Sequence, residues 1–320
     1  MKKILILILI TALMLLSCKN NSTNVDTDNN GSSTETQEEL DKYGIDIDTA
    51  TKEIIEEALN KYYQDKGEYK LIFKGTSTKV YDGMKNGDTI AGMVENTKIK
   101  NVVISAEHVI FENNKIKDST FGGDQNYNTT IVKITIPDTI TEIGKDAFVC
   151  ANLTNVNMHK NLKTIEDGAF YACKFKTLNF PNTLKKIGYF AFPICALENL
   201  TIPNSVTDIG ARAFENCAKL KTIKLSDNMK VLEENLFSSC HSLQNITIPS
   251  NVKEIKRRAF DSCRSLDNIT FLSANPPIIG ENAFIGTVIK TIYVPRVSKS
   301  QYEQLKGKYG IEQSVNIVEL

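Results

Sequence analysis

Six of the seven cysteines recur at an almost constant interval along the chain. Neighbouring members of this set are 22 or 23 residues apart: Cys150, Cys173, Cys195, Cys217, Cys240 and Cys263. Thiols at a regular spacing could hold a metal ion, form disulfides or fill small buried spaces. The interval also implies a structural unit that repeats with the same period.

The regular interval argues against a metal site. A structural zinc ion needs four ligands around one point, whereas one thiol per repeat places the sulfur atoms along a line. Disulfides between successive turns stay open as an alternative, because stacked strands lie about 4.8 Å apart and bridged Cα atoms about 4.4–6.8 Å apart. Side chains in one column point in parallel, however, and not toward one another. We therefore favour small buried side chains in a tight corner, and we predict no metal and no cofactor.

No other set of residues matches a catalytic arrangement. The histidines His108, His159 and His241 share no position within the repeat, and acidic pairs such as Glu233-Glu234 do not recur at one position. The chain has 38 basic and 38 acidic residues, and this balance gives no reason to expect nucleic acid as a partner. We predict that the protein is not an enzyme and does not bind nucleic acid.

The seventh cysteine, Cys18, follows an apolar segment at the start of the sequence. Ile4 to Leu16 is apolar except for Thr11, and its length suits a signal peptide better than a helix across a bilayer core of about 30 Å. The segment ends in Leu15-Leu16-Ser17-Cys18, which resembles a bacterial lipobox. This resemblance implies that residues 1–17 are a signal peptide and that a lipid on Cys18 attaches the mature chain to a membrane. An ordinary secretory peptide or a membrane anchor with a coincidental cysteine is the alternative.

The segment after Cys18 has the composition of a tether. From Lys19 to Glu39 nearly every residue is polar, so it cannot bury enough apolar surface to offset its chain entropy. We predict that residues 18–45 form a lipidated flexible linker.

Residues 46–98 form a separate helix and strand block in this interpretation. Apolar residues recur at three- and four-residue intervals from Ile54 to Tyr62, which predicts a helix that Gly67 ends. Asp48 or Thr49 could cap its start, and a strand is expected at 69–73. We expect this block to pack against the N-terminal end of the repeats, because most of its apolar face would otherwise contact water.

A phrase of the form Ile-Gly-x-x-Ala-Phe recurs through the rest of the chain. Its phenylalanines are 22 to 24 residues apart: Phe148, Phe170, Phe192, Phe214, Phe237, Phe260 and Phe284. A degraded copy ends at Phe121. Upstream alternations such as Leu200-Thr-Ile202-Pro203 predict short strands with one buried face, each ended by a proline that cannot donate a ladder hydrogen bond. One repeat buries too little apolar surface to fold alone, so the copies must stack.

This pattern resembles the BspA-like leucine-rich repeat family of bacterial surface proteins. The resemblance spans residues 99–295, in about eight repeats of 22–24 residues. It implies a β-rich, right-handed leucine-rich repeat solenoid with a parallel sheet on one side, between the small α/β N-terminal block and a C-terminal cap at 296–320. In the cap we expect a helix at 300–306 and a strand at 315–318. Family members are generally exposed on the cell surface and take part in adhesion or host interaction.

Residues between the buried positions of the predicted strands should face solvent. Of sixteen such residues, thirteen are Asn or Thr. They form two columns, Lys133, Asn155, Thr177, Asn199, Thr222, Asn245, Asn268 and Thr291, and Thr135, Asn157, Asn179, Thr201, Lys224, Thr247, Thr270 and Tyr293. This face suits hydrogen bonding to a glycan or to protein backbone, with little dependence on salt. The alternative is that these short polar residues only keep the sheet solvated.

We place the candidate ligand-binding face at its centre, on Asn199, Thr201, Thr222, Asn245 and Thr247. The expected function is that of a membrane-anchored surface lipoprotein, presenting this face for adhesion or for interaction with a host protein or glycan. Its location would be the cell envelope, at the cell surface, with Cys18 as the lipid attachment site. The alternative is a structural or scaffolding envelope lipoprotein without an external ligand.

Overall fold

The computed structural model of the protein describes residues 35–80, 89–122, 130–149 and 152–320. The chain divides into two units, Met1–Glu35 and Thr36–Leu320, and every helix and strand named below belongs to the second unit. The predicted signal peptide, Cys18 and Cys150 lie outside the described residues. Among the residues that are described, no helix is long and apolar enough to cross a bilayer.

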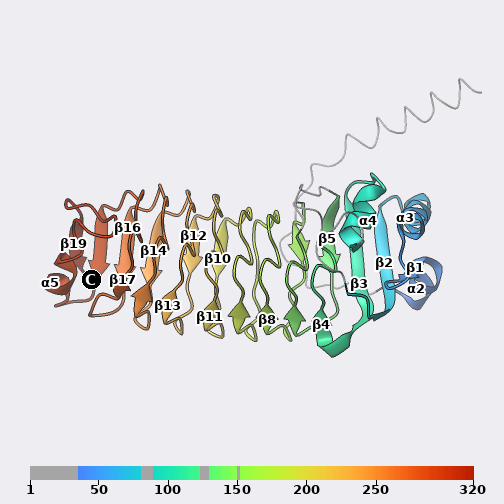
Figure 1. The fold of residues 1–320 in the computed structure, drawn as a ribbon, viewed down its shortest axis with the longest axis horizontal. Helices are drawn as coiled ribbons and strands as arrows, with labels where there is room; N and C mark the ends of the chain where they lie inside the picture. Colours follow the sequence, from blue (N-terminus) through green and yellow to red (C-terminus); the bar gives the residue numbers. More distant parts are fainter. Residues whose placement is uncertain (1–34, 81–88, 123–129, 150–151) are drawn as a thin grey trace, which may run out of the picture. The chain divides into compact units, whose positions relative to one another are not determined.

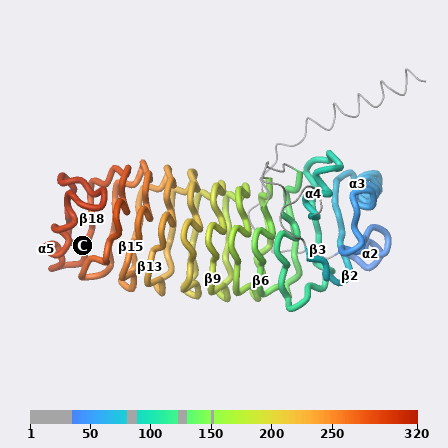
Figure 2. Tube along the Cα trace, viewed as in Figure 1, coloured from blue at the N-terminus to red at the C-terminus, as the bar shows by residue number. Residues whose placement is uncertain are grey.

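Short parallel strands run in two lines along Thr36–Leu320 (Figure 1). The first line contains β1 (Gly44–Asp46), β2 (Lys70–Ser77), β3 (Val102–Phe111), β5 (Ile131–Thr135), β7 (Asn155–Val156), β10 (Asn199–Thr201), β12 (Thr222–Lys224), β14 (Asn245–Ile248), β16 (Asn268–Phe271), β18 (Thr291–Val294) and β19 (Asn316–Glu319). They pair as three sheets with the orders β1-β2-β3-β5-β7, β10-β12 and β14-β16-β18-β19. Figure 2 shows the coils following one another, and the predicted solenoid of stacked repeats is confirmed.

The second line consists of two-residue strands inside the Ile-Gly-x-x-Ala-Phe phrase. They are β4 (Lys115–Ile116), β6 (Glu142–Ile143), β8 (Thr164–Ile165), β9 (Lys186–Ile187), β11 (Asp208–Ile209), β13 (Val231–Leu232), β15 (Glu254–Ile255) and β17 (Ile278–Ile279). The repeat pattern predicts a sheet on one side only, and the structure adds this line because two residues are too few to show an alternating pattern. The glycine that follows is needed for close stacking, since a Cβ on Gly188 would lie 2.6 Å from the backbone nitrogen of Asp167.

The phenylalanine of each repeat belongs to one continuous stack in the core. Neighbouring rings from Phe121 to Phe284 have centroids 5.0 to 5.8 Å apart and are nearly parallel, within 23°. All of these side chains are fully buried. The predicted inward phase of the repeat is therefore confirmed.

The cysteine column lies beside this stack. The described members, Cys173, Cys195, Cys217, Cys240 and Cys263, are buried and form no disulfide, so the disulfide alternative is wrong for them. Each Sγ donates to the carbonyl oxygen of the phenylalanine one coil earlier, at 3.2 to 3.4 Å. Burial raises the pKa of the Cys217 and Cys263 thiols to about 12. The interpretation as small buried side chains is confirmed for these five.

Helix α2 (Gln37–Tyr43) shows that the predicted linker end at residue 45 is too late. The Thr36 hydroxyl accepts from the Glu39 N–H and the Glu39 carboxylate accepts from the Thr36 N–H, which forms a capping box. Tyr43 packs on Tyr62 with ring centroids 4.8 Å apart, and β1 pairs with β2. Composition alone concealed this helix, because few apolar residues dock it. The Thr36-x-x-Glu39 spacing is the signal that predicts it.

Helix α3 (Lys52–Lys66) is the predicted helix of the N-terminal block. Its N-cap is Thr51, whose hydroxyl accepts from the Ile54 N–H at 3.3 Å, so the caps predicted at Asp48 or Thr49 are wrong. Gly67 ends it with a left-handed φ of 78°. Strand β2 is longer than predicted because it pairs with β3, and α4 (Ile90–Asn96) and the short 3-10 turn η1 (Glu112–Asn114) complete this end.

At the C-terminal end, α5 (Lys299–Glu303) and β19 lie where the sequence predicts a helix and a strand. Strand β19 pairs in parallel with β18 and so continues the first line of strands. Tyr302 of α5 is buried against Phe271, with ring centroids 5.0 Å apart, and its hydroxyl donates to the Ser273 carbonyl oxygen at 2.9 Å.

Candidate functional site

The five predicted face residues, Asn199, Thr201, Thr222, Asn245 and Thr247, all expose their side chains to solvent. They alternate with buried residues along β10, β12 and β14, as a strand with one buried face requires. Strand pairing sets Asn199 opposite Thr222 in the next coil. The predicted orientation is therefore confirmed, and the structure then divides the five into two groups.

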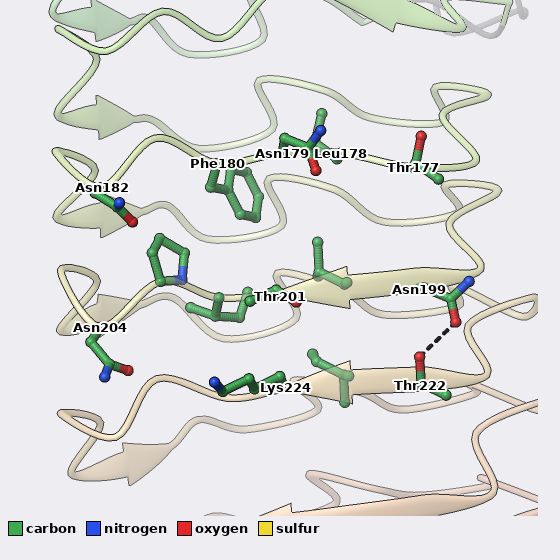
Figure 3. Close-up of a pocket in the computed structure, with 14 residues that line it drawn as sticks. Thr177, Leu178, Asn179, Phe180, Asn182, Asn199, Thr201, Asn204, Thr222 and Lys224 are labelled. Atoms are coloured by element: carbon green, nitrogen blue, oxygen red, sulfur yellow. Dashed lines mark hydrogen bonds between the residues drawn. The ribbon is translucent and has the colours of Figure 1, made fainter. Parts of the chain in front are cut away.

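Three of the five, Asn199, Thr201 and Thr222, line a shallow depression of about 740 Å³ on this face (Figure 3). Asn245 and Thr247 do not line it. The depression spans three successive coils and adds residues that the predicted set does not contain. Its other polar lining residues are Thr177, Asn179, Asn182, Asn204 and Lys224.

The first line of strands is interrupted at the depression. Thr177–Phe180 joins the following coil through a single isolated bridge between Asn179 and Thr201. One coil earlier, the Asn157 side chain replaces backbone pairing: its Oδ1 accepts from the Ile136 N–H at 2.8 Å, and its Nδ2 donates to the Ile136 carbonyl at 3.0 Å. Regular pairing resumes at β10 and β12 with three residue pairs, and β14 and β16 form four. The depression thus extends from this interruption over the two coils that follow it.

Three apolar side chains of the lining are slightly less deeply buried than their equivalents further along the solenoid. Leu178, Phe180 and Ile223 are 8, 9 and 9% exposed, whereas Ile246 and Ile269 are 2 and 0% exposed. All three line the depression. Its floor is therefore partly apolar and its walls are amides and hydroxyls, a combination that binding sites for small molecules share.

Hydrogen bonds hold two of the lining amides in place. Asn199 Oδ1 accepts from the Thr222 hydroxyl at 2.6 Å. Asn204 Oδ1 accepts from the Asp227 N–H at 2.9 Å, and Asn204 Nδ2 donates to the Asp227 carboxylate at 2.9 Å. These contacts cross from one coil to the next, so the amides are oriented before any ligand arrives. Preorganised polar groups reduce the entropy lost on binding.

Charge at the depression is limited to one lining residue, Lys224. Two acidic groups of these coils, Asp227 and Glu198, are already engaged. Asp227 accepts from Asn204, and Glu198 is paired with Lys221 at 3.0 Å. The hydrogen bond from Lys221 lowers the pKa of Glu198, so this carboxylate stays ionised and neutralised by its partner.

A second exposed surface follows β9 in the same coils, and the sequence analysis missed it. Tyr189 is 48% exposed, and Phe190 contacts both Tyr189 and Tyr171, with ring centroids 5.7 and 5.5 Å apart. Phe190 has a left-handed φ of 54°, which is rare for a bulky residue. The sequence does contain a signal for this surface. Tyr189 and Phe190 are both aromatic, whereas charged pairs, Lys145-Asp146 and Arg257-Arg258, occupy the same two positions in other repeats.

The repeat region matches a known protein family. A family profile described as "BspA type Leucine rich repeat region" matches six copies in residues 93–197 and 185–308. No curated protein matches the sequence significantly.

Solved structures with similar folds come from several bacteria. A leucine-rich repeat protein from Bacteroides ovatus is 25% identical with a TM-score of 0.44, and the alignment covers 64% of each chain. One from Eubacterium ventriosum is 21% identical with a TM-score of 0.48, covering 71% of this chain and 67% of that one. A leucine-rich cell surface protein from Faecalibacterium prausnitzii is 18% identical with a TM-score of 0.29, covering 79% and 89%.

The matched segments together span residues 93–308, well over half of the 320 residues. They contain every described copy of the phenylalanine stack and the whole of the depression. The chain therefore belongs to the BspA type leucine-rich repeat family.

Proposed function

We propose that the protein is a non-enzymatic binding module of the bacterial cell surface, anchored by lipid on Cys18, and that the depression on its sheet face is the ligand site. The anchor and the surface location rest on the lipobox-like sequence at Cys18 and on the family. Lining amides and hydroxyls on stacked strands form an ordered array, since neighbouring coils are about 4.8 Å apart. The observation that carries the proposal is that this array and the edges of nearly buried apolar side chains line the same depression.

We expect one protein molecule to bind its ligand weakly, and many molecules in one membrane to bind a multivalent ligand tightly. The depression contains none of the Trp, Tyr or Arg side chains that dominate tight protein interfaces. Many copies anchored in one membrane would raise the effective affinity through multivalent contact. Weak single contacts that become strong through many copies are suited to adhesion between surfaces.

A binding screen tests the proposal. The full-length chain in detergent is applied to arrays of glycans and extracellular-matrix proteins, and each hit is retested with Thr201→Tyr, which fills the depression with a neutral side chain. The matched control is Thr247→Tyr, on the same column but outside the depression. Tyrosine is tolerated in this column, because Tyr293 occupies it naturally.

We expect Thr201→Tyr to weaken binding at least tenfold and Thr247→Tyr to leave it unchanged. Equal binding by both variants would move the site away from the depression, for example to the cluster around Tyr189. Protease treatment of intact cells separates the surface module from the scaffolding alternative, because a scaffold that faces the periplasm would be protected.

A further inference from the structure

Two groups of the depression are hydrogen-bond donors without a partner among the described residues. Asn199 Oδ1 accepts from the Thr222 hydroxyl, while the amide nitrogen of Asn199 has no partner there. The ammonium group of Lys224 contributes three further donors and no acceptor. A ligand that engages these two groups must offer acceptors to both.

The ammonium group of Lys224 also has no anionic partner in the described part of the chain. Two described lysines of these coils differ in this respect: Lys221 pairs with Glu198 at 3.0 Å and Lys256 with Glu233 at 2.8 Å. In Figure 3 the Lys224 side chain extends along the face beside the labelled polar residues of the depression. An unpaired cation beside unpaired donors favours an anion, and a carboxylate fits this geometry.

The floor of the depression selects among carboxylate-bearing ligands. Leu178, Phe180 and Ile223 are nearly buried and contribute a small apolar area to the floor, on which the C–H face of a sugar ring can rest while its hydroxyls contact the amides. An extended peptide would need an open strand edge, yet β10 is flanked by β12 on one side and by Asn179 on the other. The volume of about 740 Å³ also suits a short oligosaccharide.

We infer that the depression binds an acidic oligosaccharide, with Lys224 as the partner of a sugar carboxylate. This inference rests on the proposed function and narrows its ligand class. The sequence analysis expects binding with little dependence on salt, because the face is almost uncharged. Binding of a carboxylate through Lys224 should instead weaken as the salt concentration rises.

The test compares sugars that differ only in charge. Trigalacturonic acid and 3′-sialyllactose are titrated against the full-length chain in detergent, each beside its methyl ester. The variant Lys224→Gln removes the charge and keeps a donor. Lys133→Gln is the matched control, since Lys133 is the other lysine in the two face columns and does not line the depression.

We expect at least one acid to bind about tenfold more tightly than its ester, in line with a hydrogen bond to a charged group. Lys224→Gln should abolish this preference, whereas Lys133→Gln should keep it. A preference that survives Lys224→Gln, equal binding of acid and ester, or binding of neither acid overturns the inference. The proposed function stays separately testable, because loss of array hits in Thr201→Tyr does not depend on the charge of the ligand.

Discussion

Replacing Phe214 with alanine removes an inner ring from the phenylalanine stack. Phe214 is fully buried, and its ring lies 5.6 Å from Phe192 and 5.8 Å from Phe237, nearly parallel to both. Deleting a buried phenylalanine side chain costs about 3–5 kcal/mol, and each lost ring pair accounts for about 0.5–1.5 kcal/mol of that. Because each coil contacts only its neighbours, the loss also weakens the coupling between the two halves of the solenoid.

Two further variants calibrate this prediction. Phe284→Ala removes the last ring of the stack, which has one stacked neighbour, Phe260 at 5.3 Å, so its cost should be smaller by about one ring pair, or 0.5–1.5 kcal/mol. Phe190→Ala removes a partly exposed ring outside the stack and should cost about 1 kcal/mol or less.

The measurement is urea unfolding of the full-length chain followed by far-UV circular dichroism, because the sequence contains no tryptophan. Hydrogen exchange adds a local readout, in which Phe214→Ala should lower amide protection in the coils on both sides of residue 214. If Phe214→Ala costs no more than Phe190→Ala, the stack does not stabilise the solenoid and the reasoning fails.

Four other outcomes are expected. Alkylation of native Cys217 and Cys263 at pH 8 should be roughly a thousandfold slower than in the unfolded chain, because a thiol pKa of about 12 leaves few thiolates; rapid native labelling would contradict this burial. Since the folded pKa of these thiols exceeds the unfolded value of 9.0, their contribution to stability should be complete below pH 9 and decline as pH rises toward 12. Metabolic labelling with a fatty-acid probe should mark the wild type and not Cys18→Ala, and label that persists in the variant refutes lipidation at this residue. Tyr302→Phe should lower the free energy of unfolding by about 1 kcal/mol, because the Ser273 carbonyl loses its hydrogen bond, and an unchanged urea midpoint would show that water replaces it.

The sequence by itself was enough to predict the solenoid and the phase of its side chains. A period of 22–24 residues, with a phenylalanine in every copy and a cysteine in six of them, leaves few ways to bury both, so the copies must stack in register. Alternation along each strand then predicts that the Leu200 side chain points into the core and that the side chains of Asn199 and Thr201 point to solvent. These features are local and repeat many times, which is why they could be read without knowing any distant contact.

The location of the depression could not be read in this way, and only the tertiary structure decided it. The sequence treats Thr201 and Thr247 as equivalent positions of one column. They differ because the strand line is interrupted near Thr177–Phe180. One coil earlier, the Asn157 side chain binds the backbone of Ile136, 21 residues away in sequence. The free state of Lys224 is likewise set by which carboxylates the neighbouring coils bring near it. Such contacts depend on how successive coils are packed, and the period alone does not specify them.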